Sequence, residues 1–184
     1  MNENWQTANN HITYKRMKGN HWFQWEFINK YVNENNIKSI LDVGCGEIKH
    51  IKGSSEWVGI DLSSAIKNKK VIHADFLNYK FDREFDMVLI AGVVNHYTNE
   101  TFEKFLEAAL AVNPKHIIIT FFTKMMTDTS KSSKLRTSKG TYILCHFGIA
   151  SIKRTLKKYN LNNYTFEKID TKSNILIIRR DING

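Results

Sequence analysis

Glycines and acidic residues follow the ends of short apolar runs in the first half of the chain. The first case is the stretch LDVGCG at 41–46, which places Gly44 and Gly46 directly after an apolar run. Glycine at such a point lets the backbone approach a ligand where a side chain would collide. Two glycines at this spacing are equally typical of a tight structural turn when they stand alone. The residues that follow therefore decide between a turn and a ligand-binding loop.

Acidic residues end the next two apolar runs. Asp61 closes VGID at 58–61, and Asp75 with Phe76 closes the run after it. An acid at the end of the second strand can accept both ribose hydroxyls of a nucleoside cofactor. Asp75 could accept a hydrogen bond from an adenine amino group, and Phe76 could pack on the ring. Three successive strand ends therefore point to one nucleoside.

Alternating β-branched runs and helical patterns predict the elements that hold these residues. The predicted strands are SILDV at 39–43, EWVGID at 56–61, KVIHA at 70–74, FDMVLI at 85–90 and HIIITFF at 116–122. Helical patterns cover 22–34, 98–112 and the region around 148–158. This alternation predicts a parallel sheet, and the nearly continuous apolar strands indicate that helices cover both faces.

The end of the chain predicts a different pairing. YTFEKID at 164–170 and NILIIRR at 174–180 are so close in sequence that they must form an antiparallel hairpin. We therefore expect an α/β fold: a doubly wound, seven-stranded, mostly parallel sheet with an antiparallel C-terminal hairpin and helices on both faces. The hairpin separates this fold from the nicotinamide-binding version, whose sixth strand is parallel.

The successive motifs resemble those of class I S-adenosylmethionine-dependent methyltransferases. The resemblance lies in LDVGCG at 41–46, VGIDLS at 58–63, ADF at 74–76 and FDMV at 85–88, and it covers roughly residues 37–122, with the closing hairpin matching in pattern only. The chain departs from the family where many members carry a further glycine, since Glu47 and Ile48 follow Gly46. Its first crossover, EIKHIKGSSE, is also short.

The resemblance implies S-adenosylmethionine as the cofactor and assigns parts of it to particular residues. The glycine loop would lie against the methionine part, Asp61 would bind the ribose, and Asp75 with the Phe76 backbone would reach adenine. Residues 91–96 resemble the segment that passes beneath the methyl donor. Cys45 is interpreted as a small buried filler rather than a nucleophile. The implied cofactor-binding residues are Asp42, Gly44, Cys45, Gly46, Asp61, Leu62, Asp75, Phe76, Ala91 and Gly92.

Methyl transfer needs little from a catalytic side chain. The leaving group is already activated, and placing two reactants correctly can supply roughly 7–11 kcal/mol of the acceleration. For a hydroxyl acceptor, a neutral histidine could take the proton, and His96 and His146 are the candidates, with His11 a further one if the amino-terminal segment folds over the site. Alternatively, His96 packs beside the cofactor and His146 is a loop or core histidine.

Motif absences narrow the methyl acceptor. The Asn/Asp-Pro-Pro-aromatic motif of exocyclic-amine methylation is replaced by AGVV at 91–94, and no cysteine stands in the context that cytosine C5 chemistry needs. A small-molecule, sugar or glycan acceptor is the first choice. RNA is an alternative, because the +9 net charge includes basic residues that could form a face for it, although composition alone explains the charge equally well. A cofactor-binding subunit without catalysis is a third possibility. The basic residues are Lys131, Lys134, Arg136, Lys139, Lys153, Arg154, Lys157 and Lys158.

The 184 residues fit a single methyltransferase domain, 1–184. Within it we expect residues 1–36 to form a helical segment that covers the site, where Tyr14, Trp22 and Trp25 either line an acceptor pocket or seal the core. Residues 123–147 are expected to be a substrate-side insert, and TDTSKSSKLRTSKG at 127–140 predicts an exposed loop.

Other patterns bear on partners and location. The chain start lacks the pattern of a signal peptide and no apolar run is long enough to span a bilayer, so we expect a cytoplasmic protein without membrane contact. Cys45 and Cys145 lack metal-ligand spacing, so no metal is expected. No pattern indicates an oligomeric state.

Overall fold

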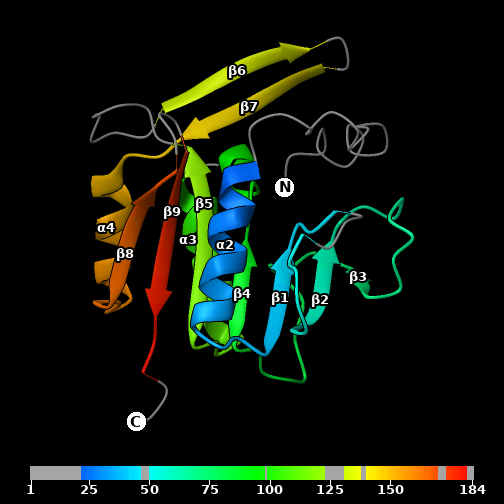
Figure 1. Ribbon diagram of the computed structural model, residues 1–184. Coiled ribbons are helices and arrows are strands. Elements are labelled where there is room, and N and C mark those ends of the chain that lie inside the picture. The colour runs from blue at the N-terminus through cyan, green and yellow to red at the C-terminus, as the bar shows by residue number, and fades with distance from the viewer. Residues whose placement is uncertain are drawn as a thin grey trace.

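A seven-stranded sheet forms the centre of the computed structural model, which describes residues 22–46, 50–97, 99–122, 131–137, 140–169 and 173–181 (Figure 1). In chain order its strands are β1 (Ser39–Val43), β2 (Glu56–Asp61), β3 (Val71–His73), β4 (Met87–Ile90), β5 (His116–Phe122), β8 (Tyr164–Lys168) and β9 (Ser173–Arg179). Their order in space is β3-β2-β1-β4-β5-β9-β8.

Strand directions follow the predicted pattern. The first five strands pair in parallel, with β1 between β2 and β4. Strand β9 runs antiparallel to β5, and β8 pairs antiparallel with β9. The predicted fold class, with its antiparallel C-terminal hairpin, is thereby confirmed. From β1 the chain adds β2 and β3 on one side and then continues with β4 on the other side of β1. The carboxyl ends of β1 and β4 therefore form the edge where ligands bind in such sheets.

The continuously apolar strands supply two hydrophobic cores, one on each face of the sheet. In β4, Met87 and Leu89 belong to one core, whereas Val88 and Ile90 belong to the other. Successive side chains of a strand point to opposite faces, so every position of a strand covered on both sides must be apolar. Burying each such side chain contributes roughly 1.5–3 kcal/mol.

Helices cover both faces of the sheet. Helix α2 (Trp22–Glu34) packs on one core through Ile28 and Val32, and its bounds confirm the helix predicted at 22–34. Helices α3 (Asn99–Ala111) and α4 (Ile149–Lys158) pack on the other core (Figure 1). In the described ranges, no helix combines the length and the apolar character that crossing a membrane demands.

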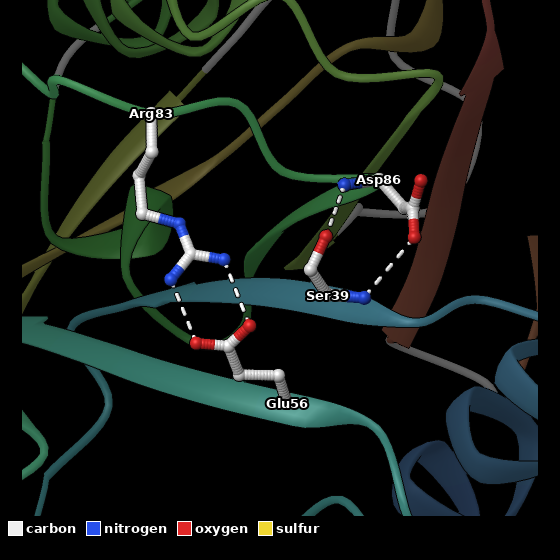
Figure 2. Close-up of polar contacts among 4 residues, drawn as sticks. All are labelled: Ser39, Glu56, Arg83 and Asp86. Carbon is white, nitrogen blue, oxygen red and sulfur yellow. Dashed lines mark hydrogen bonds and ion pairs between the residues drawn. The ribbon is translucent and has the colours of Figure 1, made fainter.

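Polar contacts fix the register at the amino ends of the strands. Asp86, before β4, accepts a hydrogen bond from the backbone N–H of Lys38 at 2.9 Å. It also accepts one from the Ser39 N–H at 3.1 Å, and its own N–H donates to the Ser39 hydroxyl at 2.9 Å (Figure 2). Beside them, Arg83 donates two hydrogen bonds to the Glu56 carboxylate. By fixing the register of β1, β2 and β4, these contacts determine which residues lie at the carboxyl ends of the strands.

A second, two-stranded sheet replaces much of the loop predicted at 127–140. Strands β6 (Lys131–Thr137) and β7 (Gly140–His146) pair antiparallel, and Figure 1 shows them beyond the carboxyl end of β5. The loop prediction is wrong for 131–137. The Ser- and Lys-rich composition of β6 is a poor local signal for a strand, but β6 pairs with β7 along its whole length, and Thr141, Tyr142 and Ile143 of β7 are residue types that favour strands.

Candidate functional site

The glycine loop after β1 has backbone geometry that glycine adopts easily. Gly44 and Gly46 have φ angles of +66° and +63°, and the Gly44 N–H donates to the Ile60 carbonyl at 2.8 Å. A Cβ on Gly44 would lie 2.4 Å from Cγ2 of Val93, in the segment after β4. The loop therefore presses closely on that segment, and its exposed backbone at Gly44 could meet a ligand.

Cys45 packs beneath this loop. A Cβ on Gly59 would lie 2.4 Å from the Cys45 Sγ, so β2 needs a glycine where the thiol sits. Burial raises the pKa of the Cys45 thiol, and the negative charges of Asp42 and Asp61 raise it further. A thiol held neutral in this way is no nucleophile, in keeping with the interpretation of Cys45 as a buried filler.

Asp61 connects the loops at the ends of β1 and β2. Its carboxylate accepts hydrogen bonds from the backbone N–H of Gly46 at 3.0 Å and of Ser63 at 2.8 Å, one on each oxygen. Its backbone carbonyl accepts a hydrogen bond from the Ala74 N–H, after β3, at 3.1 Å. A carboxylate offers about four lone-pair sites, so each oxygen can still accept a hydroxyl.

Asp42 lies behind the loop, not on its exposed rim. Its side chain is 2% exposed, and Oδ2 accepts a hydrogen bond from the Trp57 indole at 3.1 Å. Burial raises the pKa of the Asp42 carboxyl to about 7; the bond from Trp57 opposes the rise and the charge of Asp61 adds to it. Asp42 and Asp61 are therefore near neighbours, although only Asp61 reaches both loops.

Asp75 lies in the turn after β3. Its carboxylate accepts hydrogen bonds from the Leu77 N–H at 3.1 Å and the Asn78 amide at 2.9 Å. The Phe76 ring is buried and stacks on Phe105 of α3, with ring centroids 6.0 Å apart. Because that ring packs in the core, the Phe76 backbone is favoured over the ring for a ligand contact.

The segment after β4 forms the other side of this edge. Gly92 has a φ of +72°, its N–H donates to the Thr120 hydroxyl at 2.8 Å, and a Cβ there would meet open space. Ala91 is half-buried, as is Leu62 after β2. A short 3₁₀ helix, η2 (Val94–His96), follows, with Asn95 only 1% exposed.

Some of the predicted residues are placed only in part. The backbone of His96 belongs to η2, and that of His146 ends β7. The structure does not describe the side chains of these two residues or of Trp22. His11 and Tyr14 lie outside the described ranges altogether. Trp25 is half-buried and stacks on His50 with ring centroids 4.2 Å apart, just after the glycine loop.

Sequence reasoning missed two features of this edge. The first is the indole of Trp57, which is the hydrogen-bond donor to the buried Asp42. The second is Tyr97, directly after η2, whose hydroxyl experiences the charges of Asp75 and Asp61. In the sequence, the one signal for Trp57 or Tyr97 was that each is an aromatic residue close to a motif. Within the described ranges, no group of His, Cys, Asp or Glu side chains could hold a metal ion.

Comparisons with known proteins identify the fold through structure alone. No protein-family model matches the chain, and no curated protein matches its sequence. A solved structure of a didemethyltoxoflavin N1-methyltransferase from Burkholderia thailandensis, with bound S-adenosylhomocysteine, is 10% identical with a TM-score of 0.67; the match covers 85% of this chain and 77% of that one.

Two further solved structures extend the likeness. Magnesium protoporphyrin IX methyltransferase from Synechocystis, with bound S-adenosylhomocysteine, is 14% identical over 97% of this chain and 93% of its own, with a TM-score of 0.66. A sugar N-methyltransferase from Streptoalloteichus is 14% identical over 91% of each chain, with a TM-score of 0.63. The chain has the fold of the class I S-adenosylmethionine-dependent methyltransferases, as the motifs predicted.

The close contact of the glycine loop predicts a specific energetic coupling. Gly44→Ala should lower the free energy of unfolding by roughly 1–3 kcal/mol from overpacking, in addition to backbone strain of about 1–2 kcal/mol. Val93→Ala in the same chain should recover the overpacking part, which urea unfolding of the single and double variants measures. Gly92→Ala is the control, because it adds strain at a similar φ without a clash. Equal losses for Gly44→Ala and Gly92→Ala would contradict the contact.

The raised pKa of Asp42 predicts a stability profile. Between pH 4 and 7 the folded protein keeps a proton on Asp42 that the unfolded chain has lost, so its contribution to the free energy of unfolding falls as pH rises. The shift from 3.8 to about 7 corresponds to roughly 4 kcal/mol. Urea unfolding across this range should show a fall in the wild type that Asp42→Asn lacks, because an amide does not ionise. Parallel curves for the two proteins would exclude a buried, protonated Asp42.

Proposed function

We propose that this protein is an S-adenosylmethionine-dependent methyltransferase with the adenosyl group of the cofactor at the carboxyl edge of the sheet. The observation that carries the proposal is the position of Asp61. Its carboxylate joins the glycine loop to the loop after β2 and retains lone pairs for two ribose hydroxyls. In a sheet with this strand order, that edge is where a nucleoside cofactor binds.

The residues around Asp61 have complementary tasks in this proposal. The glycine loop, whose backbone is exposed at Gly44, would lie against the methionine part, and Asp42 lies buried behind that loop. Asp75 presents a carboxylate for the adenine amino group. Ala91 and Gly92 form the floor beneath the reacting centre, where Gly92 has open space in place of a side chain.

The bound cofactor would supply a methyl group on an activated sulfonium. The protein's own contribution is then to hold the acceptor in line with that methyl group and to exclude water, which can account for most of the acceleration. We propose His96 as the residue that takes the proton from a hydroxyl acceptor, with His146 as the second candidate. The proposal rests on the position of His96 in the chain, at the end of η2, which continues the segment after Gly92.

We propose a small-molecule, sugar or glycan acceptor, methylated on oxygen or nitrogen. Support comes from proteins of the same fold, whose described substrates include a didemethyltoxoflavin and a sugar. The β6–β7 hairpin adds to it, because β7 lies against η2 and β5 at the carboxyl edge. We assign the insert at 123–147 to acceptor binding on this basis. Of the segment 1–36 that the sequence predicts to cover the site, α2 packs on a face of the sheet, and residues 1–21 lie outside the described residues.

Ligand binding tests the central assignment. Isothermal titration should show S-adenosylhomocysteine binding to the wild type, and Asp61→Ala should weaken it at least a hundredfold, because two hydrogen bonds to a charged group are worth roughly 1.5–3 kcal/mol each. Asp61→Asn keeps an acceptor oxygen and should fall between the two. Asp82→Asn, the same change at an exposed site, is the control. Wild-type affinity in Asp61→Ala would remove the ribose assignment.

Turnover tests the proposed base. With a hydroxyl acceptor, His96→Ala should lower kcat at least tenfold while S-adenosylhomocysteine affinity stays within twofold, because a base acts on the acceptor rather than on the cofactor. His146→Ala serves as the comparison. The proposed base would be contradicted if His96→Ala kept the wild-type kcat, or if it lowered only the affinity for S-adenosylhomocysteine. His96 would then pack beside the cofactor without taking a proton.

A further inference from the structure

Tyr97 lies beside the turn that carries Asp75. Its backbone is extended after η2, and its N–H donates to the Val94 carbonyl at 3.0 Å. The half-buried ring packs against Phe105 of α3 with centroids 5.2 Å apart, and Phe105 in turn stacks on Phe76 at 6.0 Å. The row of three rings connects the end of η2 with the Asp75–Phe76 turn.

Tyr97 lies within electrostatic reach of the acids of the candidate site. Burial raises its pKa, and the negative charges of Asp75 and then Asp61 raise it further. Both carboxylates can only accept hydrogen bonds, whereas a phenol hydroxyl can donate and accept. Tyr97 therefore brings to this edge a donor, and a ring that is less buried than that of Phe76.

We propose that Tyr97 binds the adenine nucleoside beside the Asp75–Phe76 turn, with its ring against the base and its hydroxyl toward the ribose hydroxyls and adenine amino group that Asp61 and Asp75 would bind. The inference rests on the proposed function and adds a residue that no motif assigned. The Phe76 ring is buried against Phe105 and Phe81, whereas the Tyr97 side chain, on the other side of Phe105 in this row of rings, is half-buried. Its role is to position the nucleoside, not to react.

A packing role is the competing explanation. If Tyr97 only fills space beside Phe105, then disturbing Phe105 from the core side should have the same effect on ligands as changing Tyr97. Phe105 is 4% exposed and belongs to the core of that face. Phe105→Leu therefore separates the two explanations, because it loosens the packing and leaves the Tyr97 hydroxyl in place.

The test compares two ligands by isothermal titration. S-adenosylhomocysteine carries the whole cofactor frame, and 5′-methylthioadenosine keeps the nucleoside but lacks the amino-acid part. Tyr97→Phe should weaken both ligands by the same factor, about threefold to tenfold for one hydrogen bond. Tyr97→Leu should weaken both at least tenfold. Tyr79→Phe removes a hydroxyl from an exposed tyrosine and should change neither.

Thermal melting accompanies each titration. Phe105→Leu should lower the melting temperature and keep both affinities within twofold of the wild type. Tyr97→Phe should weaken both ligands and leave the melting temperature unchanged. Should Tyr97→Leu fail to fold, Tyr97→Phe decides alone. Unchanged binding of 5′-methylthioadenosine in Tyr97→Phe, or an equal loss in Phe105→Leu, would overturn the inference. A wild type that binds neither ligand would overturn the proposed function and this inference with it.

Discussion

A carboxylate taken out of water needs hydrogen-bond donors, and at Asp61 the backbone supplies them. The side chain is 8% exposed, and both of its oxygens accept N–H groups from loops on different strands. Charge-assisted hydrogen bonds of this kind are roughly twice as strong as neutral ones. The carboxylate therefore fixes the loops after β1 and β2 relative to each other. The proposed cofactor site depends on this arrangement of the two loops.

The opposite edge of the sheet makes this arrangement possible. Asp86 and Ser39 exchange hydrogen bonds that pin β1 to β4 at their amino ends, and Glu56 with Arg83 does the same for β2 (Figure 2). Exposed ion pairs contribute little stability, but register is a matter of geometry. A shift of one residue would turn the side chains of a strand to the opposite face and move the ends that carry the site.

The fold could be predicted because its signals are local and repeated. Strands buried on both faces must be apolar throughout, so β1, β2 and β5 have the bounds that their sequence runs indicate. The β6–β7 hairpin was missed because Ser and Lys in β6 favour no strand until β7 lies beside them. At the site, motifs located Asp61, but the Trp57 bond to Asp42 and the position of Tyr97 arise from contacts across the sheet, which spacing along the chain does not record.

A crystal structure of the protein grown with S-adenosylhomocysteine tests the account most directly. The account predicts both ribose hydroxyls within about 3.2 Å of the Asp61 carboxylate oxygens, with the existing bonds from Gly46 and Ser63 intact. A ligand bound elsewhere on the molecule, or one at this edge that leaves Asp61 in contact with its two backbone donors alone, would contradict it.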